Sequence, residues 1–258
     1  MPLISENQYI SPVAHLKTVS VCAPAFNEES GVASVLRTWT FDLEKAVADK
    51  LIEEYEIVIC DDGSSDGTVS VLKSLKMKNL VIVQNIANQG AGIAIRNAIT
   101  ASKNEYVITI DSDGQFNLSE ALKWFLHIQE RMIILGYRRK ADNLLLKIGS
   151  KISTKLFARA LKLELPDANC MLKLIPGDVA RKLDLRAVGL NYSGEMTFLL
   201  INSHLPFRWE QVSHQRRFQG KSSAKLFRDG RRRLIFQFYL ILEYSLIKRN
   251  IISKRDTL

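Results

Sequence analysis

The stretch YEIVICDDGSSDGTVSVLKSL (residues 55–75) contains a strand, a turn and the start of a helix. Its first residues form a nearly continuous apolar run, which is typical of a strand buried on both faces. The glycines and small polar residues of DDGSSDG favour a tight turn. Ser65 or Asp66 could cap the helix that follows, and this role suits Asp66 best. The unit indicates a parallel sheet covered by helices.

The same alternation continues on both sides of this unit. Further strand-like runs occupy residues 18–26, 79–85, 105–113 and 131–137, and helical patterns separate them. We therefore expect an α/β fold with a mostly parallel central sheet and helices on both faces. No clear domain boundary is expected before about residue 200.

Polar side chains gather where the predicted strands end. Asn27 and Glu28 follow the first strand, Asp61 and Asp62 the second, and Asp111 and Asp113 the fourth. In open parallel sheets, ligands bind at the carboxyl ends of the strands. The pattern therefore predicts one site to which all three pairs contribute.

The motif DSDGQ (111–115) suggests a site for a divalent cation. Two unpaired carboxylates close together repel each other, and one of them would take up a proton unless a cation lies between them. Asp111, Asp113 and the side-chain oxygen of Gln115 are hard donors that suit Mg²⁺ or Mn²⁺, and such ions usually also bind substrate phosphates. The alternative is a capping turn, in which Asp113 only leads into a helix.

Several other protein classes are disfavoured. The segment NQGAGIAIRNA (88–98) has Ile95 where a dinucleotide-binding fingerprint needs a third small residue, and no Walker A sequence occurs. The four histidines lack the spacing of a zinc site. The chain has three cysteines, Cys22, Cys60 and Cys170. Because they are odd in number and far apart, we expect buried thiols rather than disulfides.

Positive charge is concentrated towards the C-terminal end. Residues 1–200 contain 23 Lys and Arg against 23 Asp and Glu, whereas residues 201–258 contain 13 against 4. This end is expected to face an anionic partner, unless it is a solvated basic tail.

The apolar run at 234–247 is too short to span a bilayer. It suits a helix lying on anionic lipid, or alternatively a core helix with charged ends. No signal peptide is visible.

A basic stripe precedes this region. Lys147, Lys151, Lys155 and Arg159 recur at every fourth residue. On a helix they share one face, at a cost of a few tenths of a kcal/mol per pair. The stripe is expected to face an anion, or alternatively solvent.

Six segments resemble family 2 glycosyltransferases and occur in the order typical of that family. They are APAFNEE, IVICDDGSSDGT, NQGAGIAIRNAI, ITIDSDGQF, YSGEM and RFQGKSS, within about residues 18–228. The branch they resemble contains dolichol-phosphate mannose synthase and bacterial polyprenyl-phosphate glycosyltransferases. The resemblance implies a GT-A domain, a Rossmann-like nucleotide-diphospho-sugar transferase fold, at residues 1–228. The basic and apolar helical segment at 229–258, predicted above from its own pattern as interfacial or alternatively core, would follow this domain.

The resemblance also implies roles for individual residues. A GDP- or UDP-sugar donor would lie against Pro24, Ala25, Asn27, Glu28 and Asp62. Asp111, Asp113 and Gln115 would hold Mg²⁺ or Mn²⁺ on the diphosphate. Arg217, Gly220 and Ser222 would close over the donor, and Arg138 would lie in the acceptor region. The segment DANCMLKLI (167–175) departs from the branch, because Met171 stands where glycine is usual; Asp167 and Lys173 match.

The implied reaction is inverting transfer of a sugar to a polyprenyl phosphate by a peripheral protein at the cytoplasmic face of a membrane. The metal, Asp113 and Arg217 would act on the departing diphosphate. A lipid phosphate needs no base, whereas a saccharide hydroxyl would need one, with Glu195 or Asp167 as candidates. The alternatives are a transferase of the same fold acting on a saccharide hydroxyl, and a non-catalytic nucleotide-sugar binder. No nucleic-acid partner is expected, because the basic tail carries no known nucleic-acid motif.

Overall fold

The computed structural model describes residues 17–128, 131–138, 144–189, 191–215, 235–243 and 245. For residues 144–150 and 153 it describes the backbone alone. Among the residues singled out above, Arg217, Gly220 and Ser222 lie outside the described ranges, as does the side chain of Lys147.

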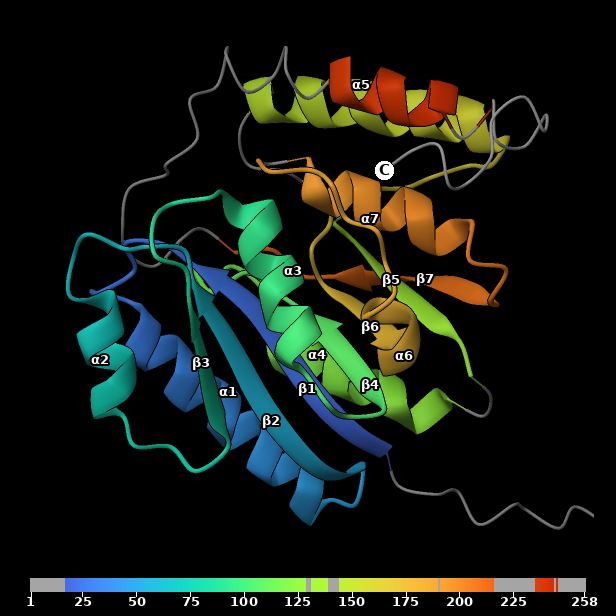
Figure 1. Ribbon diagram of the computed structural model, residues 1–258. Helices are drawn as coiled ribbons and strands as arrows, with labels where there is room; N and C mark the ends of the chain where they lie inside the picture. Colours follow the sequence, from blue (N-terminus) through green and yellow to red (C-terminus); the bar gives the residue numbers. More distant parts are fainter. Residues whose placement is uncertain are drawn as a thin grey trace, which may run out of the picture.

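A seven-stranded sheet forms the centre of the described structure, in the order β3-β2-β1-β4-β6-β5-β7 (Figure 1). The strands are β1 (Lys17–Ala25), β2 (Ile52–Asp61), β3 (Leu80–Gln84), β4 (Tyr106–Thr109), β5 (Ile133–Arg138), β6 (Lys173–Pro176) and β7 (Phe207–Val212). Every neighbouring pair is parallel except the two pairs that include β6. The expected α/β fold with a mostly parallel sheet is confirmed.

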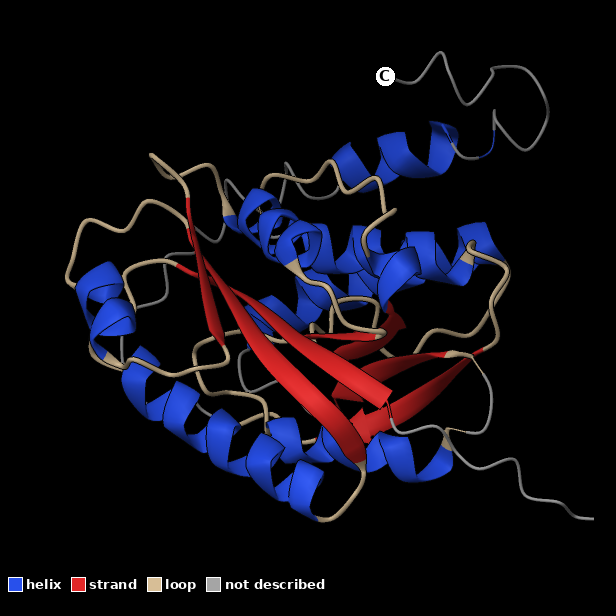
Figure 2. Ribbon diagram, turned by 60° about the horizontal axis from the view of Figure 1, so that its bottom comes forward, coloured by secondary structure: helices blue, strands red, loops and turns tan. Residues whose placement is uncertain are grey.

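Helices cover both faces of the sheet (Figure 2). The helices of the first face are α1 (Val32–Ala48), α2 (Thr68–Ser74) and α4 (Leu118–Lys123), the last continued by the 3₁₀ turn η1 (Trp124–His127). The helices of the opposite face are α3 (Ala91–Ala101), α7 (Tyr192–Ile201) and α5 (Leu144–Leu161), the last lying outside α7. A short helix, α6 (Gly177–Ala180), follows β6.

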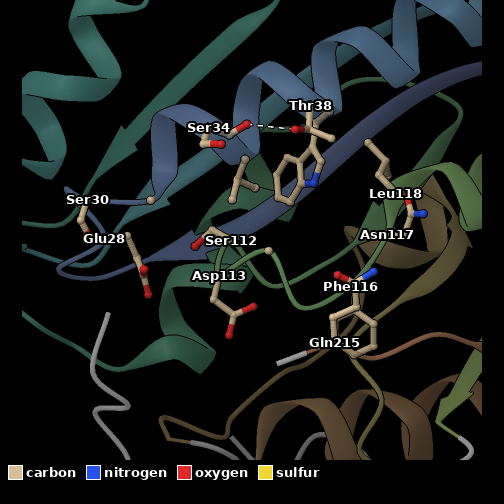
Figure 3. Close-up of a pocket in the computed structure, with 14 residues that line it drawn as sticks. Glu28, Ser30, Ser34, Thr38, Ser112, Asp113, Phe116, Asn117, Leu118 and Gln215 are labelled. Carbon is tan, nitrogen blue, oxygen red and sulfur yellow. Dashed lines mark hydrogen bonds between the residues drawn. The ribbon is translucent and has the colours of Figure 1, made fainter. Parts of the chain in front are cut away.

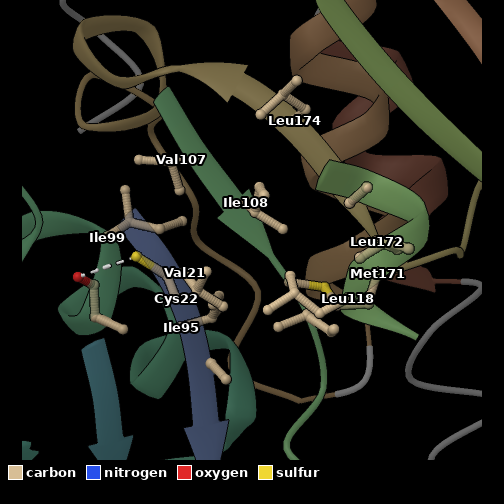
Figure 4. Packing of buried hydrophobic residues seen from close by; sticks show 14 of the residues in the cluster. Val21, Cys22, Ile95, Ile99, Val107, Ile108, Leu118, Met171, Leu172 and Leu174 are labelled. Carbon is tan, nitrogen blue, oxygen red and sulfur yellow. Dashed lines mark hydrogen bonds between the residues drawn. The ribbon is translucent and has the colours of Figure 1, made fainter. Parts of the chain in front are cut away.

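The core lies between the sheet and its helices. Val21 of β1 and Ile108 of β4 are fully buried and pack in one cluster with Ile95 of α3 (Figure 4). Each such side chain contributes roughly 1.5–3 kcal/mol by leaving water. All three cysteines are free and buried, so the expectation of buried thiols is confirmed.

The reversed strand β6 places a cation at the functional edge of the sheet. Because β6 runs antiparallel to β4, its first residue, Lys173, pairs with Thr109 at the carboxyl end of β4. Asp111 lies two residues beyond Thr109 in the sequence. The start of β6 and the end of β4 therefore supply opposite charges to the same place.

Residues 235–243 form a helix that packs on the outside of α5 and α7 (Figure 1). Leu240 of this helix joins Phe157 of α5 and Phe198 of α7 in a second, smaller core cluster. One side of helix 235–243 is thus part of the packed body. Among the described residues, no helix combines the length and apolarity needed to cross a bilayer.

Candidate active site

The loops that follow β1 and β2 are tied to each other at the carboxyl edge of the sheet. Asn27 has a left-handed backbone (φ 55°), a conformation that asparagine tolerates well. Its backbone N–H donates to Ser64 Oγ (2.9 Å), and its Oδ1 accepts from the Ser65 N–H (2.9 Å). The next residue, Glu28, donates its N–H to Thr68 Oγ1 (2.9 Å). Asn27 and Glu28 therefore hold the two loops together.

Pro24 and Ala25 join the end of β1 to both acidic motifs through their backbone. The Pro24 carbonyl accepts from Ser112 Oγ (2.7 Å), in the middle of DSD. The Ala25 carbonyl accepts from the Asp62 N–H (2.8 Å). The three strand ends predicted to form one site are therefore connected by hydrogen bonds.

The carboxylates of Asp61 and Asp62 have different surroundings. Asp62 is buried and accepts three hydrogen bonds, from Asn85 Nδ2 (2.8 Å), the Gln89 N–H (2.9 Å) and the Gly90 N–H (2.7 Å). It holds the turn that leads into α3, so a direct contact with the nucleotide is not supported for it.

Asp61 is fully buried; the strand-end pattern predicted it at the site, whereas the family resemblance assigned a nucleotide contact to Asp62 alone. Its Oδ2 accepts from the Ser64 N–H (3.1 Å), whereas its Oδ1 has no hydrogen-bond partner among the described residues. Buried carboxylate oxygens are nearly always satisfied, so this atom is an exception within the described structure. Nothing in the sequence separates Asp61 from Asp62, since the difference lies in which backbone N–H groups surround each carboxylate.

Asp111 and Asp113 are half-buried, and the charge of Asp111 acts on Asp113. Burial raises the pKa of Asp111, despite the hydrogen bond from Tyr192 Oη (2.9 Å) and the positive charges of Arg138 and Lys173. Burial, together with the negative charge of Asp111, raises the pKa of Asp113 to about 7. Tyr192 was not among the predicted site residues. It lies in the YSGEM segment, three residues before Glu195.

This pair suits a divalent cation. The charge of Asp111 raises the pKa of Asp113, and an ion between the two carboxylates would stabilise both in their charged form. The side chain of Gln115 is held by a hydrogen bond from its Nε2 to the Gln215 carbonyl (3.0 Å). Its other polar atom, Oε1, is therefore the one that could bind a cation. No group of three or more His, Cys, Asp or Glu side chains in the described ranges could hold a metal. Phosphate and water oxygens would have to complete the coordination, as is usual for Mg²⁺.

The charges of two cations, Arg138 and Lys173, act on Asp111. Arg138 makes a two-point contact with Asp167, with Nε to Oδ2 at 2.7 Å and Nη2 to Oδ1 at 3.2 Å. Lys173 is buried and donates to Ser193 Oγ (3.1 Å) and to the Cys170 carbonyl. Burial lowers the pKa of Lys173 to about 8. Although burial alone would raise the pKa of Asp167, the hydrogen bonds and charge of Arg138 lower it below its usual range.

Glu195 does not have the surroundings of a catalytic base, which corrects its predicted role. Its side chain is fully buried, and its two carboxylate oxygens accept from the backbone N–H groups of Arg186 (3.0 Å) and Ala187 (2.8 Å). Burial raises its pKa against those hydrogen bonds. Glu195 instead anchors the 186–188 loop, which in turn lies on α3, where Gly92 donates its N–H to the Val188 carbonyl (2.9 Å).

A cavity of about 330 Å³ opens beside Asp113 (Figure 3). Its lining combines Glu28 and Asp113 with residues of α1, including Ser34 and Thr38, and with Phe116. Gln215 also lines it. The cavity therefore borders the predicted metal site on the α1 side of the sheet.

A family model described as glycosyl transferase family 2 matches residues 20–181. The chain belongs to glycosyl transferase family 2. The resemblance stated from the six segments is confirmed.

Curated relatives of this family 2 glycosyltransferase include two lipid-phosphate sugar transferases by name. Undecaprenyl-phosphate 4-deoxy-4-formamido-L-arabinose transferase of Aeromonas hydrophila is 29% identical over 163 residues, covering 61% of this chain and 48% of that protein. Dolichyl-phosphate beta-glucosyltransferase of Drosophila melanogaster is 25% identical over 225 residues, covering 75% of this chain and 67% of that protein. The chain thus spans about half the length of the first of these relatives.

Solved structures share the GT-A fold of this glycosyltransferase. Mannosyl-3-phosphoglycerate synthase from Rubrobacter xylanophilus superposes with a TM-score of 0.65 at 14% identity, over 93% of this chain and 76% of that one. Glucosyl-3-phosphoglycerate synthase from Mycobacterium tuberculosis, solved with Mn²⁺ and UDP-glucose, gives 0.59 at 18% identity, over 86% of this chain and 79% of that one. The predicted fold is confirmed.

Proposed function

We propose that this glycosyltransferase transfers a sugar, with inversion, from a nucleotide-sugar to a polyprenyl phosphate. The observation that carries the proposal is the half-buried Asp111–Asp113 pair, together with the positive charges of Arg138 and Lys173 that act on Asp111. Such a site offers a cation position for a diphosphate and, next to it, positive charge for a second phosphate. The names of two relatives include undecaprenyl phosphate and dolichyl phosphate, which supports a polyprenyl phosphate as the acceptor.

The donor would occupy the edge formed by β1, β2 and β4. Asp61 Oδ1 would accept an N–H of the base, a group that both uracil and guanine offer. Asn27, Glu28 and the backbone of Pro24 and Ala25 would shape this side, with Asp62 holding the turn before α3. Asp111, Asp113 and Gln115 would hold Mg²⁺ or Mn²⁺, which would supply charge that stabilises the departing diphosphate.

The acceptor would approach from the side of Arg138 and Lys173. One phosphate oxygen of the acceptor would attack the anomeric carbon, so that its C–O bond forms as the bond from that carbon to the donor diphosphate breaks. The oxygen is already anionic, so no proton must be removed. This agrees with Glu195 and Asp167, whose carboxylates are both committed to hydrogen bonds within the chain.

The hydrogen bonds of Glu195 and Asp167 also favour a polyprenyl-phosphate acceptor over a saccharide hydroxyl. A hydroxyl would need a base, and neither candidate is available for that role without losing its partners. We further propose that Arg217, with Gly220 and Ser222, closes over the donor, as the family resemblance implies. The protein would work peripherally at the cytoplasmic face of the membrane, where lipid phosphates present their head groups.

Release of nucleoside diphosphate tests the proposal directly. Purified protein would receive a panel of UDP- and GDP-sugars with Mn²⁺, with and without a short-chain, water-soluble polyprenyl phosphate. Release that depends on the lipid phosphate is expected. Arg138→Gln should weaken that dependence while slow donor hydrolysis persists, and Arg131→Gln, at an exposed arginine paired with Asp178, is the matched control. Release only with a saccharide acceptor would refute the proposed substrate.

A further inference from the structure

Tyr192, the first residue of α7, reaches across to the predicted metal site. Its Oη donates a hydrogen bond to Oδ1 of Asp111 (2.9 Å), a residue that lies 81 positions earlier in the chain. An ionised carboxylate has no proton to give, so the phenol is the donor. The proposed reaction leaves this contact without a role.

The two aspartates of the DSD turn are oriented in different ways. Asp113 is held within its own turn, because its Oδ1 accepts from the Gln115 N–H (3.1 Å). The backbone between the two aspartates is held by Ser112, whose Oγ donates to the Pro24 carbonyl (2.7 Å). In the described part of the chain, the carboxylate of Asp111 accepts a hydrogen bond from Tyr192 alone. Asp111 is therefore oriented from another element.

These contacts leave the same atom of each carboxylate for a cation. Oδ1 of Asp111 and Oδ1 of Asp113 each accept a hydrogen bond, whereas neither Oδ2 accepts one from a described residue. The last torsion of an aspartate side chain is broad, so a donor fixed on one oxygen determines where the other one points. Orientation matters for Mg²⁺ in particular, because this ion demands nearly ideal octahedral geometry.

Tyr192 is mounted rigidly enough to do this. Its side chain is 6% exposed and belongs to the main core cluster. Its backbone N–H donates to the Gly189 carbonyl (3.3 Å), and its Cβ lies 3.2 Å from where a Cβ on Gly92 of α3 would stand. The next residue, Ser193, accepts from Lys173 Nζ (3.1 Å). The start of α7 is thus fixed from several sides.

We infer that Tyr192 is a positioning residue of the metal site, whose hydroxyl sets the orientation in which Asp111 presents Oδ2 to Mg²⁺ or Mn²⁺. Groups that hydrogen-bond to metal ligands orient those ligands, and losing such a group typically lowers metal affinity by about 10–100-fold. The inference rests on the proposed function only in taking the Asp111–Asp113 pair to be the metal site.

Tyr106 provides the matched control, a tyrosine that packs without touching the site. It is 5% exposed, and its ring meets that of Phe125 edge-on at 5.7 Å. It begins β4, at the end of the strand away from Asp111. Its hydroxyl makes no hydrogen bond with any residue of the described ranges. Tyr106→Phe therefore removes a hydroxyl from an equally buried ring and leaves the metal site as it is.

Metal binding tests the inference without any turnover. Mn²⁺ would be titrated into the protein with UDP or GDP present and followed by electron paramagnetic resonance, with neither sugar donor nor lipid. Tyr192→Phe should raise the Kd for Mn²⁺ by about tenfold or more, whereas Tyr106→Phe should bind like the unaltered protein. Equal affinities of the two variants would overturn the inference.

A second ion separates positioning from a purely structural role. Ca²⁺ accepts flexible ligand arrangements, so its Kd, measured by competition with Mn²⁺, should change by less than about threefold in Tyr192→Phe. Phenylalanine keeps the ring in the core, and the melting temperature of the metal-free variant should fall by no more than about 4 °C. A structural role would weaken both ions alike, and that result would also overturn the inference.

A double-mutant cycle tests whether Tyr192 acts through Asp111. In an Asp111→Asn background the ligand that the phenol orients is already altered. Adding Tyr192→Phe should then change the Kd for Mn²⁺ by less than about twofold. A further tenfold loss would show that the phenol acts by another route, against the inference.

The positioning role and the proposed function can fail separately. If Mn²⁺ binding follows these predictions while no sugar donor releases its nucleotide with lipid phosphate, the proposed function fails and the role of Tyr192 stands. If lipid-dependent release occurs and Tyr192→Phe binds Mn²⁺ normally, the role of Tyr192 fails alone. If the unaltered protein binds no Mn²⁺ with either nucleotide, the inference falls together with the metal assignment.

Discussion

Five carboxylates at the active edge differ in what surrounds them rather than in kind. Asp62 and Glu195 are buried but satisfied by hydrogen-bond donors of the chain, mostly backbone N–H groups. Asp111 and Asp113 are half-buried neighbours, and Asp61 keeps one oxygen without a partner in the described structure. The first kind stabilises loops, whereas the second kind would be stabilised by a bound ligand or cation.

Replacing Asp113 with asparagine should separate function from folding. Asp113→Asn removes one of the two charges that would hold the metal, so metal-dependent nucleotide release should fall by roughly 100-fold or more. The melting temperature without metal should stay equal or rise, because a repulsion with Asp111 is lost. Ser34→Ala, at the rim of the same cavity, should leave turnover unchanged. Near-normal turnover of Asp113→Asn would contradict the metal assignment.

The raised pKa of Asp113 predicts how stability depends on pH. In the folded protein the pKa is about 7, against an ordinary value of 3.8, so the folded state binds more protons between these two values. The metal-free protein should therefore lose stability as pH rises from about 4 to about 7. Mn²⁺ should raise the melting temperature more at about pH 8 than at about pH 5.5, because the carboxylate is ionised only at the higher pH. Equal shifts at both values would argue against this site.

Glu195→Gln distinguishes a loop anchor from a catalytic base. The glutamine would turn an NH₂ group towards one of the two backbone N–H groups, which should lower the free energy of unfolding by about 1–3 kcal/mol. Turnover with lipid phosphate, measured below the new melting temperature, should fall by less than about tenfold. If Glu195 were a catalytic base, its replacement would leave the free energy of unfolding unchanged and lower turnover by about 100-fold or more.

At the scale of elements, the contact between α3 and the 186–188 loop joins the two halves of the site. A Cβ added to Gly92 would lie 1.7 Å from the Ala187 carbonyl oxygen. Backbone there cannot move without displacing the residues that Glu195 holds. Glycine is needed here for close approach rather than for an unusual backbone angle.

Gly92→Ala should therefore destabilise the protein by about 3 kcal/mol, because overpacking meets backbone and not a flexible side chain. Donor affinity should fall as well, since the entry to α3 would shift. Gly189→Ala is the matched control in the same loop, because nothing lies within 4 Å of its added Cβ. Denaturant unfolding of both variants would check this, and equal free energies would show that the loop moves freely.

The sequence predicts the first five strands and misses the last two. The runs that became β1 to β5 are apolar and followed by turn residues, so each is visible locally. The direction of β6 depends on pairing with β4 and β5, far away in the sequence, and β7, which pairs with β5, lies outside the predicted runs. Lys173 and Tyr192 therefore reach Asp111 through contacts that no local pattern reveals.

At the scale of the whole molecule, helix 235–243 belongs to the packed body on one side and to the surface on the other. The sequence interpretation of a core helix describes its buried side, and the interfacial interpretation stays a prediction for its exposed side. Deleting residues 231–258 would uncover Phe157 and Phe198 as well as remove the exposed side chains of Ile235, Phe238, Tyr239 and Leu242. A truncation would thus confound a loss of membrane contact with a loss of stability, whereas single substitutions keep them apart.

Two leucines on this helix make a matched pair. Leu240→Ala should lower the free energy of unfolding by about 2–4 kcal/mol, because it empties a buried position. Leu242→Ala, at a position 49% exposed, should change it by no more than about 0.5 kcal/mol. Chemical denaturation of both variants would check this, and equal values would mean that the helix does not pack as described.

The reversal of β6 has a consequence for how the enzyme could be re-engineered. Parallel strands β1, β2 and β4 contribute through their ends, whereas β6 contributes through its beginning, at Lys173. Under the proposed function, the described donor residues lie before residue 128 and the acceptor residues between Arg138 and Ser193, while Arg217, Gly220 and Ser222 would return to the donor. A chimera that exchanged only the second stretch with that of a relative would inherit a new acceptor preference on an unchanged donor half.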